Sequence, residues 1–304
     1  MIAKKNAVTS QFVQYNRIPI CNVFAAILIS FIRCASAYAA SNENSDTKDF
    51  FQQWAATAKQ AKEKQPHWIT PLATVTPRLE QEFRYDQSWQ SKPNSVDVTN
   101  YGGGKGLELI PTENTEIIIG VPPYLVKDTA KGTDSGWGDE SITVKYRALS
   151  ANEEQGNYIV TGFIGVSSPT GTDAFSNNCT IVTPTIAAGK GWGTRETGLD
   201  IQSTLGIGIP DSNRNTVGVP VNWNTALQWH ASRYFWPEME INYTHWRAGP
   251  DDGKTQTAVT TGVILGRFAL TQTVNVIAGI GYQQPVSSFR TYQHTWLSTA
   301  RITF

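Results

Sequence analysis

Charged residues spaced two apart are a recurring chemical feature of this sequence. They are Lys145 with Arg147, Glu238 with Glu240, and the series Glu80, Glu82, Arg84 and Asp86. Because side chains two apart lie on the same face of a β-strand, each group faces one side of a sheet. Rows of both charge signs can line a solute path and set its charge preference. Ion pairs that only fill the interior of a barrel would give the same spacing.

These residues belong to a larger set that we expect to face the lumen of a barrel. The set is Glu80, Glu82, Arg84, Asp86, Glu108, Lys145, Arg147, Asp200, Gln202, Asn222, Asn224, Glu238 and Glu240. An isolated buried charge is costly, so charges in a narrow lumen must be paired or hydrated. Lys or Arg facing lipid would each cost about 2–4 kcal/mol at the membrane midplane, which favours the inward register. We predict a network across the lumen that narrows any path through it.

Catalytic chemistry has weaker support. A barrel enzyme that cleaves lipids needs Ser and His side by side, usually with a third polar group. The histidines are His67, His230, His245 and His294, and the last two are expected near the outer rim. No Gly-x-Ser-x-Gly motif is present, and the Gly-rich stretch 101–106 lacks the Gly-Lys-Ser/Thr ending of a phosphate-binding loop. We therefore predict no catalytic residue, no metal site and no cofactor.

The elements that would position these side chains are alternating runs separated by clusters of Gly, Asn, Asp and Ser. Twelve strands are expected, near 79–89, 105–112, 115–124, 140–149, 156–167, 180–189, 197–209, 217–231, 235–247, 257–268, 272–283 and 293–304. Long polar connections at 90–104, 127–138, 168–179 and 248–256 alternate with short ones, as outer loops and inner turns do in such barrels. The predicted fold class is all-β, a transmembrane antiparallel up-and-down β-barrel.

Aromatic residues help to separate a membrane barrel from a soluble sandwich, because both give alternating faces. Membrane barrels collect Trp and Tyr at the two headgroup levels. The apolar faces carry such residues near strand ends: Trp89, Trp229, Tyr243, Tyr282, Trp296 and Phe304. Three positions break the pattern: Trp223 is near mid-strand, Gln81 interrupts the first run, and Leu265 shares a face with Arg267.

The two ends of the sequence agree with export to an envelope. Basic residues precede an apolar run from Ile18 to Ile32, and Ala37-Tyr38-Ala39 follows, so residues 1–39 are predicted to be a signal peptide cleaved after Ala39. The final run places the terminal Phe304 on its apolar face. Such an end resembles the signal that the outer-membrane barrel-assembly machinery reads. Expected partners are that machinery, outer-membrane lipids and a small-molecule solute.

Residues 40–76 form a polar leader before the barrel, which is expected to span 77–304. The stretch from Asp46 to Lys64 has helical character, and Gln65-Pro66 ends it. Three roles remain open for this leader: a periplasmic arm, a plug inside the barrel, or a mobile segment.

Composition narrows the function further. The predicted signal carries four basic residues and no acidic ones, so 21 of the 25 Lys and Arg remain against 25 Asp and Glu, a formal charge of −4. Nucleic-acid binding is disfavoured by this charge. Two of the three cysteines lie in the signal, which leaves Cys179 without a partner for a disulfide.

Short motifs in this sequence resemble an outer-membrane family labelled "MetA-pathway of phenol degradation". They are Gly136-Trp137-Gly138-Asp139, Lys145-Tyr146-Arg147 and Ser168-Pro169-Thr170-Gly171. The resemblance covers residues 100–304 and implies an envelope barrel for uptake of aromatic or other apolar compounds. We therefore expect passive uptake of small organic compounds across a bacterial outer membrane. The alternatives are a lipid-directed barrel enzyme and a structural or adhesive surface barrel.

Overall fold

A computed structural model of the chain describes residues 45–102 and 105–304. The predicted signal peptide and the first residues of the leader lie outside these ranges. Residues 52–304 form one compact unit, and the description below concerns that unit together with the helix that leads into it.

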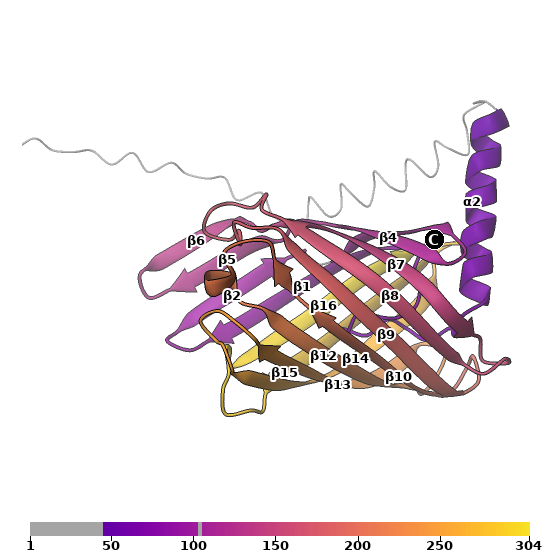
Figure 1. The fold of residues 1–304 in the computed structure, drawn as a ribbon. Coiled ribbons are helices and arrows are strands. Elements are labelled where there is room, and N and C mark those ends of the chain that lie inside the picture. The colour runs from indigo at the N-terminus through magenta and orange to yellow at the C-terminus, as the bar shows by residue number, and fades with distance from the viewer. Residues whose placement is uncertain (1–44, 103–104) are drawn as a thin grey trace, which may run out of the picture. The chain divides into compact units, whose positions relative to one another are not determined.

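Twelve antiparallel strands form a closed barrel (Figure 1). They are β1 (Glu82–Lys92), β3 (Gly106–Thr112), β4 (Thr115–Gly120), β7 (Glu140–Ala151), β8 (Tyr158–Ser168), β9 (Ile181–Gly193), β10 (Gly198–Ile207), β12 (Pro220–His230), β13 (Phe235–Trp246), β14 (Thr255–Ala269), β15 (Asn275–Pro285) and β16 (His294–Thr303). The last strand pairs with the first from Glu82↔Thr303 to Ser91↔His294, which closes the twelve strands into a barrel. The predicted fold class and strand number are confirmed.

Three further strands lengthen the barrel at the end opposite the C-terminus (Figure 1). We call this the outer end, and the end at which the last strand finishes the inner end. β2 (Val96–Tyr101) pairs with β1 and with β5 (Tyr124–Thr129), which pairs with β6 (Gly132–Trp137). The prediction of long loops at 90–104 and 127–138 was therefore wrong. The hairpin at Asn94 and Ser95, which both have positive φ, needs only a tight turn. These strands lack a continuous apolar face, so their sequences look like loops.

The barrel has an inverted distribution of polar and apolar side chains. Lys145, Glu108 and Glu240 point inward and are fully buried, whereas Ile142 and Val144 point outward and are about half exposed. A soluble sandwich would show the opposite arrangement, because charged side chains are rarely buried in it and apolar strand faces are. The interior of this barrel is polar and its outer surface is apolar.

Outward-facing aromatic side chains form rows near both ends of the barrel. Trp296 lies opposite Trp89 on one side and Tyr282 on the other, and its ring centroid is 5.0 Å from that of Tyr282. Trp223 is opposite Tyr243 and so shares the level of that residue. Near the inner end, Leu199 lies between Trp192 and Trp229. Phe304 is exposed at the end of the chain.

A β-bulge explains why Leu265 and Arg267 seemed to share a face. The register of β14 against β15 shifts between Gly266 and Phe268, so Arg267 is an extra residue. Gly266 has a φ of 139°, which a residue with a side chain rarely adopts. The bulge turns Arg267 inward while Leu265 and Phe268 both face outward.

One long helix precedes the barrel. α2 (Ser45–Glu63) confirms the predicted helix and ends just before Gln65-Pro66, where proline disfavours helical backbone in the preceding residue. Its Ala58 and Ala61 are buried with Leu79 and Ile110 at the inner end of the barrel. In the described part of the chain, no helix is long and apolar enough to cross a membrane.

Candidate functional site

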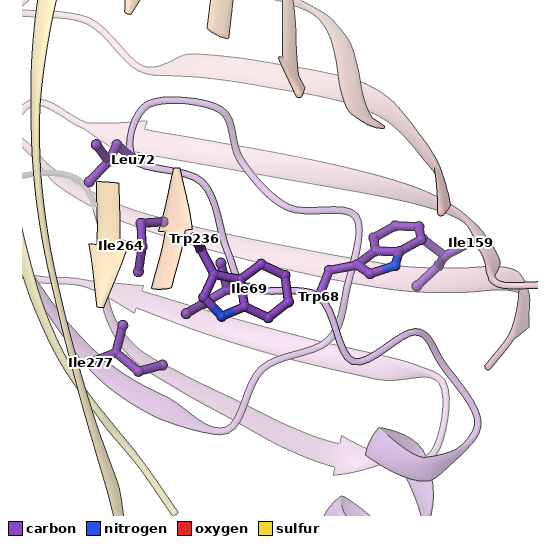
Figure 2. Packing of buried hydrophobic residues seen from close by; sticks show 7 residues of the cluster. All are labelled: Trp68, Ile69, Leu72, Ile159, Trp236, Ile264 and Ile277. Carbon is purple, nitrogen blue, oxygen red and sulfur yellow. The ribbon is translucent and has the colours of Figure 1, made fainter. Parts of the chain in front are cut away.

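The inner half of the lumen is filled by residues 64–81, which we call the plug segment. These residues connect α2 to β1 and have no helix or strand. Most of its side chains are buried, including Trp68, Ile69, Leu72 and Leu79. Figure 2 shows the first three of these inside the barrel, surrounded by Ile159, Trp236, Ile264 and Ile277 of the strands. The leader was predicted to span residues 40–76, and its part from residue 64 onward lies inside the barrel, the position for which we name the segment.

Cationic side chains of the barrel donate hydrogen bonds to the carbonyl groups of the plug segment. The bonds are Arg84 to Leu72 (2.8 Å), Arg267 to His67 (2.8 Å) and Trp68 (2.6 Å), Arg301 to Thr70 (2.6 Å) and Pro71 (3.1 Å), and Lys145 to Arg78 (3.2 Å). A segment without secondary structure cannot satisfy its own backbone groups, and buried backbone groups need partners. Bonds to charged donors are the stronger kind.

Carboxylates of the barrel accept hydrogen bonds from the N–H groups of the same segment. Glu238 accepts from Leu72 (3.0 Å), and Glu240 accepts from Ala73 (2.7 Å) and Thr74. Glu116 accepts from the backbone of Glu80 (2.7 Å). Cations therefore bind the carbonyls of the plug and anions bind its amides, so both charge signs in the lumen have a backbone partner.

Ion pairs inside the barrel join neighbours and do not cross the lumen. Lys145 and Glu116 lie opposite each other on β7 and β4, are 2.9 Å apart, and are fully buried. Arg78 pairs with Glu80 within the plug segment (2.8 Å). Removing one member of a buried pair leaves an uncompensated charge, which is strongly destabilising. These pairs differ from the predicted network across the lumen.

Three glycines of the wall make room for Leu72. A Cβ atom added at Gly262 or Gly281 would lie 2.4 or 2.6 Å from Leu72 Cδ1, and one at Gly279 would lie 2.9 Å from Cδ2. These distances are below any van der Waals contact, so a larger residue at these positions would force the side chain of Leu72 to move. We call this group the Leu72 socket.

Two further glycines do the same for Trp68. A Cβ atom added at Gly189 or Gly191 on β9 would lie 2.5 Å from the indole ring. The indole Nε1 donates a hydrogen bond of 2.9 Å to Asn157 Oδ1, which satisfies the polar atom of this buried ring. The wall is therefore shaped to the plug on β9, β14 and β15.

The outer half of the lumen has a wall of amides and hydroxyls. Asn242 is the centre of this wall: it donates to Asn224 (3.2 Å) and accepts from Thr260 (2.9 Å) and Gln283 (2.9 Å). On the other side, a cavity of about 170 Å³ is lined by Leu72, Asp86, Gln87, Ser88, Asn100, Leu297 and Ser298. The outer half is thus a polar vestibule with the plug at its base.

Each predicted lumen residue lies inside the barrel, but the positions differ in kind. Asn222, Asn224 and Asp86 are partly exposed in the outer half. The others are buried around the plug segment: Glu80, Glu82, Arg84, Glu108, Lys145, Arg147, Asp200, Gln202, Glu238 and Glu240. Glu80 was predicted on the first strand, but β1 begins at Glu82 and Glu80 belongs to the plug segment. This prediction was wrong because charged residues continue at a spacing of two back to Glu80, whereas the pairing of β1 with its neighbours begins only at Glu82.

Several residues that hold the plug were missed in the sequence. Arg301 lies on the polar face of the last strand, so strict alternation could have found it. Glu116 shares its face of β4 with Ile118 and Gly120, so alternation gives no signal there. Arg267 was hidden because the bulge changes the alternation at that point. The glycines of the Leu72 socket carry no side chain and give no chemical signal in a single sequence.

The plug segment is anchored at the inner rim by the turn that follows β7. The backbone N–H of His67 donates to Glu153 Oε1 (2.6 Å), and His67 Nδ1 lies 2.8 Å from Glu153 Oε2. Burial opposes ionisation of Glu153, but the hydrogen bonds from the ring and backbone of His67 outweigh it and lower the pKa of Glu153 to about 2. The carboxylate form therefore holds this contact.

The other histidines have separate surroundings. His230 stacks on Trp236 with ring centroids 3.6 Å apart, and His294 stacks near Tyr282 at 5.8 Å. His245 lies at the outer end of β13. Together with His67, these three histidines are distributed over both ends of the barrel.

Comparisons with known proteins found distant similarity to solved structures alone. No family model matches this sequence, and no curated protein does. Solved structures that resemble the chain include an outer-membrane channel from Pseudomonas putida F1 (13% identity, TM-score 0.48, covering 78% of this chain and 100% of that one). The NanC porin (11%, 0.46, 72% and 98%) and the KdgM porin (8%, 0.42, 73% and 99%) are also similar.

These similarities are too distant to assign a function. The resemblance to the phenol-degradation family likewise stays a prediction.

Enlarging a glycine of the Leu72 socket is expected to loosen the plug. In Gly281→Val the added atoms overlap Leu72, and overpacking of this kind costs about 1–3 kcal/mol. We expect amide hydrogens of Leu72, Ala73 and Thr74 to exchange about tenfold faster or more, measured by hydrogen exchange with mass spectrometry. The control is Gly162→Val on β8, where an added Cβ meets nothing within 4 Å. Equal exchange in both variants would contradict the socket.

Acid is expected to weaken the anchor at Glu153. A carboxyl with a folded pKa of about 2, below the value of about 4.3 for free Glu, adds stability above pH 4.3 that is lost as pH falls through 2. We expect the free energy of unfolding to decline in that window, and to decline less in Glu153→Gln. The control is Glu154→Gln, an exposed neighbour. Identical pH profiles for wild type and Glu153→Gln would rule out this linkage.

Proposed function

We propose that this protein is an outer-membrane barrel through which small solutes pass, and that residues 64–81 restrict the passage. The supporting observation is the inverted polarity: an apolar outer surface encloses a polar lumen that the chain itself partly fills. A water-filled lumen inside an apolar surface is the general design of membrane barrels that carry solutes. Export through a signal peptide at 1–39 and recognition of the terminal strand belong to the same proposal.

The restriction by the plug argues for small solutes. The cavity of about 170 Å³ at its outer surface is below the usual range of about 300–1,000 Å³ for pockets that hold drug-sized ligands. Its lining combines Ser88 and Asp86 with the apolar Leu72 and Leu297. Such a lining suits small organic molecules that carry hydrogen-bonding groups, including aromatic ones with a hydroxyl.

Solute entry into vesicles tests this function. Protein reconstituted into liposomes is expected to admit small organic solutes slowly and larger ones not at all. Gly281→Val should raise the entry rate several-fold because it loosens the plug, whereas Gly162→Val should match the wild type. Vesicles that stay impermeable with every variant would contradict the channel. Esterase activity in the same impermeable preparation would favour the lipid-directed enzyme in its place.

A further inference from the structure

We propose that the outer half of the lumen binds uncharged solutes that carry several hydroxyl groups, such as sugars and polyols. The proposal rests on the proposed function, because it names the class of solute that enters the passage. Six lumen-facing side chains carry it: Asn222, Asn224, Asn242, Thr244, Thr260 and Gln283. We call these six residues the neutral band.

The neutral band crosses four adjacent strands and contains no ionisable group. Its members belong to β12, β13, β14 and β15 and lie on the face that points into the barrel. The charged side chains on the same inward face, Glu238, Glu240 and Arg267, lie further toward the inner end, where they bind the plug segment. On the outer side of the plug segment, this wall therefore presents hydrogen-bonding groups without a charge.

Hydrogen bonds between neighbouring strands hold the band in one arrangement. Thr244 donates to Asn222 (2.9 Å) and Asn242 donates to Asn224 (3.2 Å), both from β13 to β12. From β15, Gln283 Nε2 donates to Asn242 Oδ1 at 2.9 Å. Side chains that are already oriented lose little conformational entropy when a ligand binds, so the band is preorganised.

The loop between β15 and β16 fixes Gln283 from a further side. The hydroxyl of Tyr292 donates to Gln283 Oε1 (2.7 Å), and Gln283 Nε2 also donates to Thr260 (2.9 Å). The ring of Tyr292 is buried. Thr291 ties the same loop to β14, because its backbone N–H donates to Gln256 Oε1 (2.6 Å). The amide of Gln283 is thus oriented by β13, β14 and this loop together.

The band keeps bonding capacity that faces the lumen. An Asn side chain has two N–H donors and two acceptor lone pairs, and each bond accepted within the band uses only one lone pair. Among the described residues, the amide nitrogens of Asn222 and Asn224 donate to no protein group, and both side chains are partly exposed inside the barrel. Donors and acceptors are therefore available side by side on β12.

The same chemistry continues past β16 onto β1 and β2. Ser88 and Asn100 line the cavity of about 170 Å³ at the outer surface of the plug segment. Asp86 also lines this cavity, but Arg84 pairs with its carboxylate at 2.8 Å and balances the charge. A solute in the outer half therefore meets amides and hydroxyls along this whole part of the wall.

This chemistry selects uncharged solutes that carry several hydroxyl groups. A hydroxyl both donates and accepts, which matches a wall of amides and hydroxyls, whereas a carboxylate only accepts and an ammonium group only donates. Neither ion finds an opposite charge in the neutral band. An apolar solute would cover the amides of Asn222 and Asn224 without replacing their hydrogen bonds to water, which is costly.

Saturation-transfer NMR on the solubilised protein, in a detergent without a sugar headgroup, tests the binding site. The probes are glucose, glucuronate, cyclohexanol, and glucosamine at a slightly acidic pH where its amine is charged. Because only glucose matches the band in both charge and hydroxyl groups, we expect its binding signal to exceed the other three about fivefold or more. Equal signals from all four probes, or no signal from any of them, would overturn the site.

A matched pair of variants locates the binding. Gln283→Glu adds a carboxylate to the neutral band, whereas Gln284→Glu adds it at the next residue, which is exposed on the outside of the barrel. Since charge-assisted hydrogen bonds are the stronger kind, Gln283→Glu should raise the glucosamine signal about threefold or more relative to glucose, and Gln284→Glu should match the wild type. Asn224→Asp makes the same test if Gln283→Glu fails to fold, which altered gel migration before heating would reveal. A folded inward variant with the wild-type preference would overturn the proposal.

Binding and passage can fail separately. Glucose bound with this preference by a protein that admits no solute into vesicles would overturn the channel function and leave the binding site standing. Entry of solutes into vesicles by a protein without a binding preference for glucose would overturn the site and leave the channel function standing.

Discussion

The structure depends on one constraint: an irregular segment buried in a barrel must find partners for all of its backbone groups. The lumen meets this constraint with charged side chains, since arginines and a lysine bind carbonyls of residues 68–78 and glutamates bind amides of residues 72–80. These arginines, the lysine and these glutamates gain hydrogen-bonded partners, and the backbone groups that they bind are satisfied. Barrel wall and plug are therefore stable together, because either one alone would leave buried groups unpaired.

The same dependence shapes the wall by steric fit. Glycine is unfavourable in regular strands, but Gly262, Gly279 and Gly281 leave room for Leu72, and Gly262 also lies close to the carbonyl oxygen of Ile280 on the neighbouring strand. Gly189 and Gly191 stand in the same relation to Trp68. On β9, β14 and β15 the shape of the barrel wall therefore fits the plug segment. On β1, β3 and β4 some charged atoms have no hydrogen-bond partner in the plug segment.

The fold could be predicted from the sequence because alternation, turn residues and the terminal strand are local signals. The plug could not be chosen over an arm or a mobile leader, since residues 64–81 have neither helical nor alternating periodicity and their partners are distant in sequence. Arg267 and the 90–104 region were misread for a related reason: a bulge and a tight hairpin change the pattern locally. The lumen residues were found from spacing, but their partners are backbone atoms, which no pattern of side chains reveals.

Cross-linking in membranes of cells that express the protein tests the central claim, that residues 64–81 fill the inner half of the lumen. In a Cys179→Ala background, the pair Leu72→Cys and Gly281→Cys is treated with a short bifunctional thiol reagent, and Leu72→Cys with Gly162→Cys serves as the control. The wall position Gly281 adjoins Leu72, whereas Gly162 faces outward. A cross-link in the first pair alone, identified by mass spectrometry, is the predicted result. An unlinked first pair whose two cysteines both react freely with a large polar reagent would contradict the plug.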